Sequence, residues 1–272
     1  MAQAIIIGLG SDIGRNLATR YVDEGWKVWG TMRSERNENP PENVINFFCD
    51  LTNPQSINAA AENFSLIGNS WDILIVAAGT EEPIGNFFDC DEDDWDNGIQ
   101  INTLAPLRLL RRLYPFRNQN RNTSVAFFSG SGTNNAAPSY SSYCASKIML
   151  IKMCELLNSE CNDTSFFIIG PGIVRTKIHE QTIRVPSRAG ENYKKVIDFL
   201  ASDNSGTSHD EIYQCIKWCH DIGKDVVGGR NISLVYDKWR DGGENLAVML
   251  KNSPNIYRLR RFGNEIQVED IT

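Results

Sequence analysis

Short apolar runs alternate with amphipathic stretches along the whole chain, and this alternation constrains the fold more than any other feature. The runs of strand length occupy residues 4–7, 27–31, 44–49, 73–77, 124–128, 165–169 and 232–236. Helix-like stretches separate most of them, for example residues 13–24, 55–64, 95–113 and 140–160. Strands without alternating polar positions are typical of a parallel sheet that helices cover on both faces. With right-handed crossovers, the pattern predicts a single-domain, doubly wound α/β fold around a mostly parallel seven-stranded sheet.

One stretch, residues 175–229, breaks this rhythm because it is too long for a simple crossover. We expect extra helices there, around residues 192–200 and 209–219, at one edge of the sheet. No internal repeat and no low-complexity linker divides the chain. We therefore expect one domain over residues 1–240, with residues 241–272 as a C-terminal tail that packs on the same domain.

Composition excludes several classes of protein. The chain has 272 residues, with 27 basic and 34 acidic side chains and a formal net charge of −7. An acidic protein repels nucleic-acid backbones, so we expect no nucleic-acid partner. The apolar runs are far too short to span a bilayer, and no basic leader precedes the first of them, so we expect no membrane association and a cytoplasmic location. The 7 cysteines include no Cys-x-x-Cys pair, so we expect reduced thiols and no metal site.

A glycine-rich turn follows the first apolar run. Its sequence is Gly8-Leu-Gly10-Ser11-Asp12-Ile13-Gly14, and it leads into the first helix-like stretch. Glycines permit a tight turn and the close approach of a phosphate, and a helix N-terminus attracts the negative charge of a pyrophosphate. Because the spacing differs from the usual G-x-G-x-x-G, the turn alone also fits a glycine-rich connection without a ligand.

A tyrosine and a lysine, Tyr143 and Lys147, lie four residues apart in the helix-like stretch 140–160. This spacing places both side chains on one face of a helix. A phenol ordinarily has a pKa of about 10, and a nearby ammonium group lowers that pKa toward the range useful for acid–base catalysis. The pair is a candidate acid–base group, although such pairs also occur on solvated helix faces.

Two serines, Ser129 and Ser131, stand at the end of the apolar run 124–128. A hydroxyl at the end of a strand can polarise a substrate carbonyl while a tyrosine protonates it. The sequence Ser-Gly-Ser-Gly also suits a polar turn with no role in catalysis.

Taken in order, these segments resemble the short-chain dehydrogenase/reductase family from residue 4 to about residue 236. The matching segments are the glycine turn, Asp50-Leu51-Thr52, Ala77-Ala78-Gly79, Asn102, the Ser129/Ser131 turn, Tyr143-x-x-x-Lys147 and Pro171-Gly172-Ile173-Val174-Arg175-Thr176. The resemblance implies a Rossmann-type fold, a nicotinamide cofactor and a small-molecule carbonyl or alcohol substrate. It also implies a homodimer or homotetramer formed through the helices that carry Asn102 and Tyr143.

The resemblance further implies a role for each matching residue. Tyr143 is the expected general acid/base, Lys147 is expected to lower its pKa and hold the nicotinamide ribose, and Asn102 is expected to anchor a water of the proton relay. Ser129 or Ser131 is expected to bind the carbonyl oxygen. The expected cofactor-binding residues are Gly8, Gly10, Ser11, Asp12, Ile13, Gly14, Arg33, Asp50, Leu51, Ala77, Ala78, Gly79, Tyr143, Lys147, Pro171, Gly172, Ile173 and Thr176. The implied reaction is ketone/alcohol interconversion by hydride transfer.

Several positions depart from the family's pattern. Asp12 stands where the family has the middle glycine of the first turn, and Val76-Ala77-Ala78-Gly79 replaces the usual Asn-Asn-Ala-Gly. The position of the family's catalytic serine, thirteen residues before the tyrosine, is Gly130. Ser129 and Ser131 flank that position, and we favour Ser131 because the glycines around it let the turn re-aim its hydroxyl.

The end of the second apolar run bears on the choice of cofactor. An acidic residue there binds the ribose 2′-OH of NAD, whereas an arginine accommodates the 2′-phosphate of NADP. The sequence has Arg33 and no carboxylate before Glu35. We therefore expect NADP as the preferred cofactor and NAD as the alternative; Arg33 would then be only a solvated loop residue.

Two segments carry concentrated charge. Six acids lie within residues 89–96, and we expect them to cap a helix N-terminus rather than bind a metal. Residues 175–195 carry six basic side chains against two glutamates. In the family the corresponding segment, about residues 177–228, resembles a mobile lid over the substrate. A basic lid on an acidic protein favours a sugar-linked or other anionic carbonyl substrate, whereas a solvated surface loop is the alternative.

Two other functions stay open. Gly130 and the altered Asn-Asn-Ala-Gly segment fit a catalytically weak cofactor-binding sensor or regulatory protein, whereas Asn102, Tyr143 and Lys147 oppose it. A sugar epimerase or dehydratase is the other alternative, and the short C-terminal portion disfavours it because those chemistries usually need a larger substrate domain.

Overall fold

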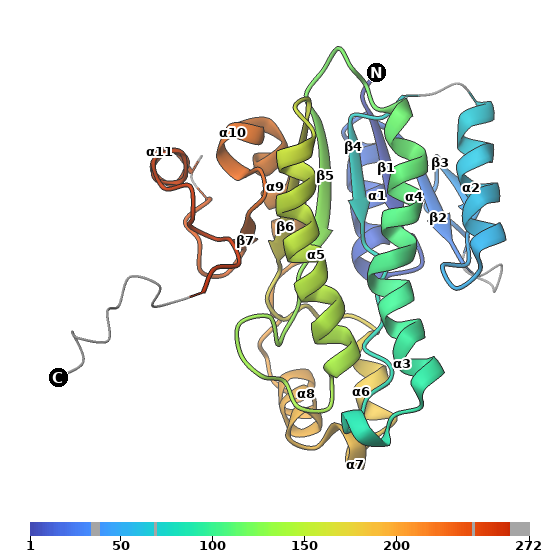
Figure 1. The fold of residues 1–272 in the computed structure, drawn as a ribbon, viewed down its shortest axis with the longest axis vertical. Helices are drawn as coiled ribbons and strands as arrows, with labels where there is room; N and C mark the ends of the chain where they lie inside the picture. The colour runs from blue at the N-terminus through green and yellow to red at the C-terminus, as the bar shows by residue number, and fades with distance from the viewer. Residues whose placement is uncertain (34–38, 68–69, 241–242, 262–272) are drawn as a thin grey trace.

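The computed structural model describes residues 1–33, 39–67, 70–240 and 243–261. These residues build a sheet of seven strands that all run parallel, in the order β3-β2-β1-β4-β5-β6-β7 (Figure 1). The strands are β1 (Gln3–Ile7), β2 (Lys27–Met32), β3 (Val44–Phe48), β4 (Ile73–Val76), β5 (Thr123–Phe128), β6 (Thr164–Gly170) and β7 (Asn231–Ser233). The direction of progression reverses between β1 and β4, which confirms the predicted doubly wound, single-domain fold.

The last strand is shorter than the predicted run 232–236. Beyond Ser233 the chain turns, because Asp237 accepts a hydrogen bond from the Ser233 amide at 2.7 Å and donates its own amide to the Ser233 carbonyl at 3.1 Å. Val235 and Tyr236 are exposed after this turn and line the main cavity of the protein. The end of the run therefore contributes to a surface rather than to the sheet.

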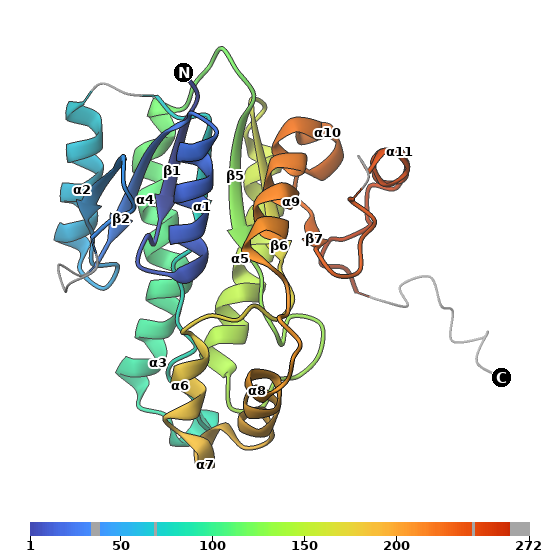
Figure 2. The same ribbon diagram turned by 180° about the vertical axis from the view of Figure 1, so that it is seen from behind.

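Helices cover both faces of the sheet, as the apolar strands predict. One face, toward the viewer in Figure 1, carries α2 (Pro54–Leu66), α4 (Ala105–Leu113) and α5 (Ser141–Glu160). The other, toward the viewer in Figure 2, carries α1 (Asp12–Asp23), α9 (His209–Ile222) and α10 (Lys224–Val227). Each face has its own apolar core cluster. The C-terminal α11 (Glu244–Asn252) buries Leu246 and Leu250 in the core cluster on the face covered by α1 and α9. The described part of the tail therefore packs on the same domain.

The helix predicted over residues 95–113 is interrupted. It begins earlier, as α3 (Glu92–Ile99), passes through a π-helical turn, η2 (Gln100–Leu104), and continues as α4. Asp91 caps α3 by accepting the Asp94 amide at 3.1 Å, and Glu92, Asp93 and Asp94 occupy the first turn. The acidic segment therefore caps a helix, as predicted. The described residues contain no group of three or more His, Cys, Asp or Glu side chains that could hold a metal ion.

Three short helices lie beyond the carboxyl ends of the strands (Figures 1 and 2). They are α6 (His179–Ile183), α7 (Pro186–Ala189) and α8 (Glu191–Ala201). By contrast, α9 packs against α1 and buries Ile212, Cys215 and Cys219 in the core beside the sheet. The segment over the carboxyl edge is thus shorter than the expected residues 177–228, because α9 and α10 cover the sheet instead. No helix within the described ranges is long and apolar enough to cross a membrane.

Candidate functional site

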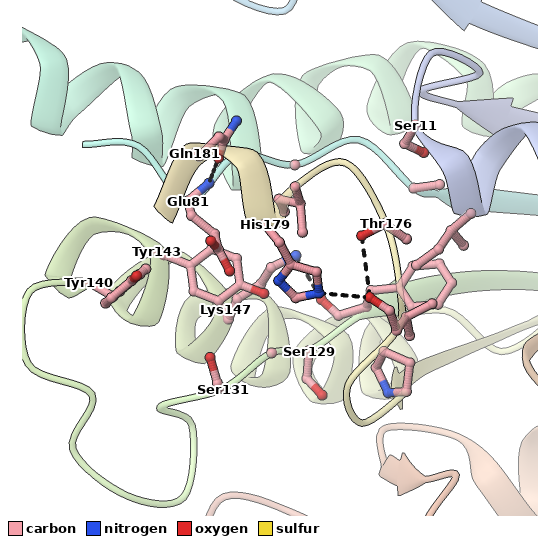
Figure 3. A pocket seen from close by; sticks show the side chains of 18 of the residues that line it. Ser11, Glu81, Ser129, Ser131, Tyr140, Tyr143, Lys147, Thr176, His179 and Gln181 are labelled. Atoms are coloured by element: carbon pink, nitrogen blue, oxygen red, sulfur yellow. Dashed lines mark hydrogen bonds between the residues drawn. The ribbon is translucent and has the colours of Figure 1, made fainter. Parts of the chain in front are cut away.

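A cavity of about 1240 Å³ opens between the carboxyl ends of the strands and helices α6 and α8. Every residue that the sequence nominated for the site lines this cavity except Gly14 and Asn102. Its residues come from loops after β1, β2, β3, β4, β5 and β6, so segments far apart in the sequence meet there. Figure 3 shows the part of the cavity around Tyr143.

The glycine turn is closed by its own hydrogen bonds. Gly8 has φ +100°, and a Cβ there would lie 2.5 Å from the Ala78 amide nitrogen. A Cβ on Gly14 would lie 2.3 Å from the Gly8 carbonyl oxygen. The Ser11 hydroxyl donates to that carbonyl at 2.9 Å and accepts the Gly14 amide at 3.0 Å, which caps α1. The turn is therefore a tight glycine cradle at a helix N-terminus, which fits a pyrophosphate.

Asp12, the residue that departs from the family's glycine, has a contact of its own. Its Oδ2 accepts the backbone amide of Lys177 at 2.6 Å. Lys177 directly precedes the segment that carries α6. The substitution thus ties the turn after β1 to the segment that covers the cavity.

Tyr143 and Lys147 lie together on the buried face of α5, and they are 9% and 5% exposed. The Lys147 Nζ donates to the Phe128 carbonyl at 3.0 Å and lies 5.5 Å from the centre of the Tyr143 ring. Burial lowers the pKa of Lys147 to about 8. Burial also raises the pKa of Tyr143, and the charge of Glu81 adds to that rise. The direction is opposite to the expected lowering, because burial of the ring disfavours the charged phenolate.

The two candidate serines differ in placement. The Ser129 hydroxyl donates to Asn231 Oδ1 at 3.1 Å and to the Ile169 carbonyl at 3.3 Å, so it is used by the neighbouring strands. Ser131 is exposed at the cavity, and its carbonyl accepts the Cys144 thiol at 3.6 Å. Between them, a Cβ on Gly130 would lie 2.0 Å from the Tyr143 hydroxyl oxygen. The tyrosine thus occupies the space that a serine at position 130 would need.

Asn102 lies in the π-helical turn η2 and is fully buried. Its Nδ2 donates to the Thr80 carbonyl at 2.9 Å, and its Oδ1 accepts the Thr80 amide at 2.8 Å. The side chain therefore fixes the loop after β4. The geometry places Asn102 beside the cavity wall rather than in its lining.

Five polar residues of the cavity wall near Tyr143 carried no motif in the sequence. They are Glu81, Tyr140, His179, Gln181 and Thr182. Glu81 lies two residues after Gly79, in the loop that follows β4. Its place after a predicted strand could therefore have indicated a site residue from the sequence. The three residues of α6 could not have been found, because only tertiary packing brings them to the loop after β4.

Burial raises the pKa of Glu81 to about 7, while a hydrogen bond from Thr182 opposes the rise. When the pKa of a carboxyl group is higher in the folded than in the unfolded protein, the free energy of unfolding falls as pH rises between the two pKa values. We expect the Glu81→Gln variant to gain stability relative to wild type from pH 4.5 to 8, by up to about 3 kcal/mol. Urea unfolding of both proteins at four pH values in this range measures the difference, with the exposed neighbour Glu82→Gln as control. A wild-type-minus-variant difference that is constant with pH would contradict this assignment.

Charged side chains surround the rim of the cavity. Arg33 is exposed at its edge, near Asp50, whose Oδ1 accepts from the Thr52 amide at 2.9 Å. Glu35 lies outside the described residues. In the basic segment, Arg175 donates to main-chain carbonyls at the end of α8 and just beyond it, and Arg184 pairs with Glu180 at 3.0 Å. Two of the basic side chains in residues 175–195, Arg175 and Arg184, therefore form contacts within the protein.

Comparison with known proteins identifies the family of the chain. Residues 2–185 match the family model described as short chain dehydrogenase. A short-chain dehydrogenase/reductase of Penicillium canescens is 30% identical over 187 residues, 64% of this chain and 69% of that protein. An uncharacterized oxidoreductase of Schizosaccharomyces pombe is 25% identical over 231 residues, 74% of this chain and 90% of that protein.

Solved structures share the fold. A short chain dehydrogenase/reductase from Saccharomyces cerevisiae superposes with a TM-score of 0.76 and 22% identity, covering 92% of this chain and all of that one. The actinorhodin polyketide ketoreductase, solved with NADPH, superposes with a TM-score of 0.73 and 16% identity over 85% of this chain and 95% of that one. The family model, the sheet order and the Tyr143/Lys147 pair beside a glycine cradle agree: this chain is an oxidoreductase of the short-chain dehydrogenase/reductase family.

Proposed function

We propose that this protein interconverts a ketone and an alcohol with NADP as its preferred cofactor and Tyr143 as the general acid/base. The observation that carries the proposal is the shared cavity: the glycine cradle, Arg33, Tyr143 and Lys147 all line it. No single motif would suffice, since each has an ordinary structural explanation. Their convergence on one cavity is what a dinucleotide-dependent enzyme requires.

The residues present fit a nicotinamide dinucleotide. Gly8, Gly10 and Ser11 line the cavity at the start of α1, where a pyrophosphate would bind, and Asp50 and Leu51, expected from the family to contact the adenine, also line it. Ile173 and Thr176, expected from the family to contact the nicotinamide carboxamide, line the same cavity. When bound, the nicotinamide supplies or accepts the hydride. The protein's own part is to orient the substrate oxygen and to move a proton.

The proton is assigned to the Tyr143 hydroxyl. Because burial keeps this phenol protonated, it is in the form that donates to a carbonyl oxygen during reduction. Lys147, held by the Phe128 carbonyl at 3.0 Å, stays beside the ring and is positioned to hold the cofactor ribose. Ser131, the exposed serine at the cavity, is the better placed of the two serines to reach a carbonyl oxygen.

Basic residues at the rim of the cavity bear on the charge of the substrate. Lys177, Arg184 and Lys195 line the cavity, which supports a sugar-linked or other anionic carbonyl substrate. We also propose a homodimer or homotetramer in the cytoplasm, as the family resemblance implies.

The experiment that tests the function is a reaction panel. NADPH consumption is followed with simple ketones and with oxidised nucleotide-sugars, and NADPH binding is measured in parallel. Turnover of at least one carbonyl compound supports the oxidoreductase mechanism. NADPH binding without turnover on any of them would instead support the cofactor-binding sensor, which Gly130 favours.

Arg33 provides a separate test of the cofactor preference. The Arg33→Ala variant should raise the KM for NADPH by about 10-fold to 100-fold, because it removes charge-assisted hydrogen bonds to a 2′-phosphate. The KM for NADH should stay unchanged. The control is Arg111→Ala, which removes an exposed arginine of α4 outside the cavity. Equal changes for both cofactors, or none, would refute the preference for NADP.

A further inference from the structure

The cavity wall beside Tyr143 contains a carboxylate that the proposed reaction does not use. Glu81 Oε2 accepts the Thr182 hydroxyl at 3.1 Å, whereas Oε1 accepts no hydrogen bond from the described part of the chain. In Figure 3 the Glu81 side chain extends from the loop after β4 toward Tyr143. Glu81 is half-buried and lines the cavity, so a ligand in the cavity can reach its free carboxylate oxygen and pair with it.

The surrounding hydroxyls cannot supply that partner. Above its pKa of about 7 the Glu81 carboxylate is ionised and only accepts, so Thr182 then donates its one hydroxyl proton to Glu81. Tyr140, whose hydroxyl lies 2.7 Å from the Thr182 hydroxyl, must then donate to Thr182. The hydroxyl protons of Tyr140 and Thr182 are therefore both used within the series Tyr140–Thr182–Glu81. The lone pairs of Glu81 Oε1 stay available to a ligand in the cavity.

Glu81 is also held in place before any ligand arrives. Its amide donates to Gln181 Oε1 at 2.7 Å, and the preceding residue, Thr80, is bonded through its amide and carbonyl to Asn102. The loop is thus fixed from α6 on one side and from η2 on the other. A fixed acceptor binds a ligand without an ordering cost and discriminates more sharply than a mobile one.

A second acceptor lies in the same wall. His179, only 8% exposed, contacts the Val174 carbonyl through Nε2 at 2.9 Å. A carbonyl accepts, so Nε2 carries a proton, and in this Nε2–H tautomer Nδ1 keeps a lone pair. Nδ1 is buried and has no partner among the described residues. Figure 3 shows the ring between Tyr143 and the Thr176 side of the cavity.

We propose that the cavity binds a polyhydroxylated ketone or aldehyde, whose hydroxyl groups next to the reacting carbon donate to Glu81 Oε1 and His179 Nδ1. This inference rests on the proposed function and names its substrate class. Tyr143 supplies a donor for the carbonyl oxygen, and the opposite wall supplies acceptors for the hydroxyls, so the two kinds of substrate oxygen are distinguished by charge and by hydrogen-bond polarity. A site built to pair with hydroxyls rejects the analogue that lacks them, because its buried acceptors then stay unpaired.

Binding of a polyol tests the subsite without turnover. At pH 8.5, where Glu81 is ionised, erythritol is titrated by calorimetry into the full-length protein saturated with NADP⁺, as wild type, as Glu81→Gln and as the matched control Glu82→Gln, which changes the exposed neighbouring carboxylate. We expect wild type and the control to bind alike and Glu81→Gln to bind about 10-fold more weakly, since a charge-assisted hydrogen bond becomes neutral. Equal affinity of wild type and Glu81→Gln, or no binding to wild type, overturns the proposal.

Kinetics with matched ketones supply the second readout. We compare kcat/KM for erythrulose and for butan-2-one, two four-carbon ketones that differ in their hydroxyl groups. The ratio of the two kcat/KM values should favour erythrulose in wild type and fall by about 10-fold in Glu81→Gln. A merely structural role of Glu81 would lower both rates and leave the ratio unchanged, which overturns the subsite. If no carbonyl compound is turned over, the proposed function fails while the erythritol titration still decides the subsite.

Discussion

The Tyr143→Phe variant should lose turnover while retaining NADPH binding. The change removes one hydroxyl from a residue that is 9% exposed at the cavity, and it keeps the aromatic ring and its packing. Positioned general acids contribute about 10²-fold to 10⁴-fold to a rate, so we expect kcat/KM to fall by about that factor. Steady-state kinetics and fluorescence titration with NADPH measure the two quantities on the same preparations.

The exposed tyrosine Tyr236 offers a matched control. Tyr236→Phe removes a hydroxyl from the rim of the same cavity, and its side chain is 86% exposed. We expect this variant to keep wild-type kcat. Full activity of Tyr143→Phe would eliminate Tyr143 as the proton donor and, with it, the proposed mechanism.

The Gly130→Ala variant should lose about 10²-fold in kcat. Its Cβ would lie 2.0 Å from the Tyr143 hydroxyl oxygen and 2.6 Å from the ring carbon that carries it. The buried tyrosine must move, and a displacement of about 1 Å at a catalytic group costs roughly 10²-fold in rate. Gly130→Ser restores the residue usual in the family at this position, yet it should lose activity as well, because the Cβ is common to both substitutions.

Stability measurements separate the clash from other effects of Gly130→Ala. Overpacking costs about 1–3 kcal/mol, and this cost should be smaller in a Tyr143→Phe background, where the closest contact is removed. Urea unfolding of the two single variants and the double variant gives the coupling energy. Near-wild-type activity of Gly130→Ser would show that the tyrosine hydroxyl does not fill the position of the missing serine.

The fold was predictable because its signals are local. Apolar runs such as residues 73–77 and the amphipathic stretches between them report burial and periodicity within a few residues, and parallel order follows from the crossovers. Boundaries were less predictable. The π-helical turn at Asn102 could not be predicted, because the residues around it keep a helical pattern. The side-chain amide of Asn102 is bonded to Thr80, 22 residues away, and no local pattern reveals that contact. The length of the covering segment was overestimated because α9 has an apolar face that packs on α1, which its periodicity alone does not reveal.

The sequence by itself determined the sheet, the glycine turn, and the Tyr143/Lys147 pair on one helix face, because each depends on spacing along the chain. Only the tertiary structure decided the sign of the change in the Tyr143 pKa, since desolvation depends on everything packed around the ring. It also placed Thr182 on Glu81 across 101 residues of sequence. That contact forms only when α6 lies over the loop after β4, so the acceptors that define the proposed substrate class are a property of the packing and of no local motif.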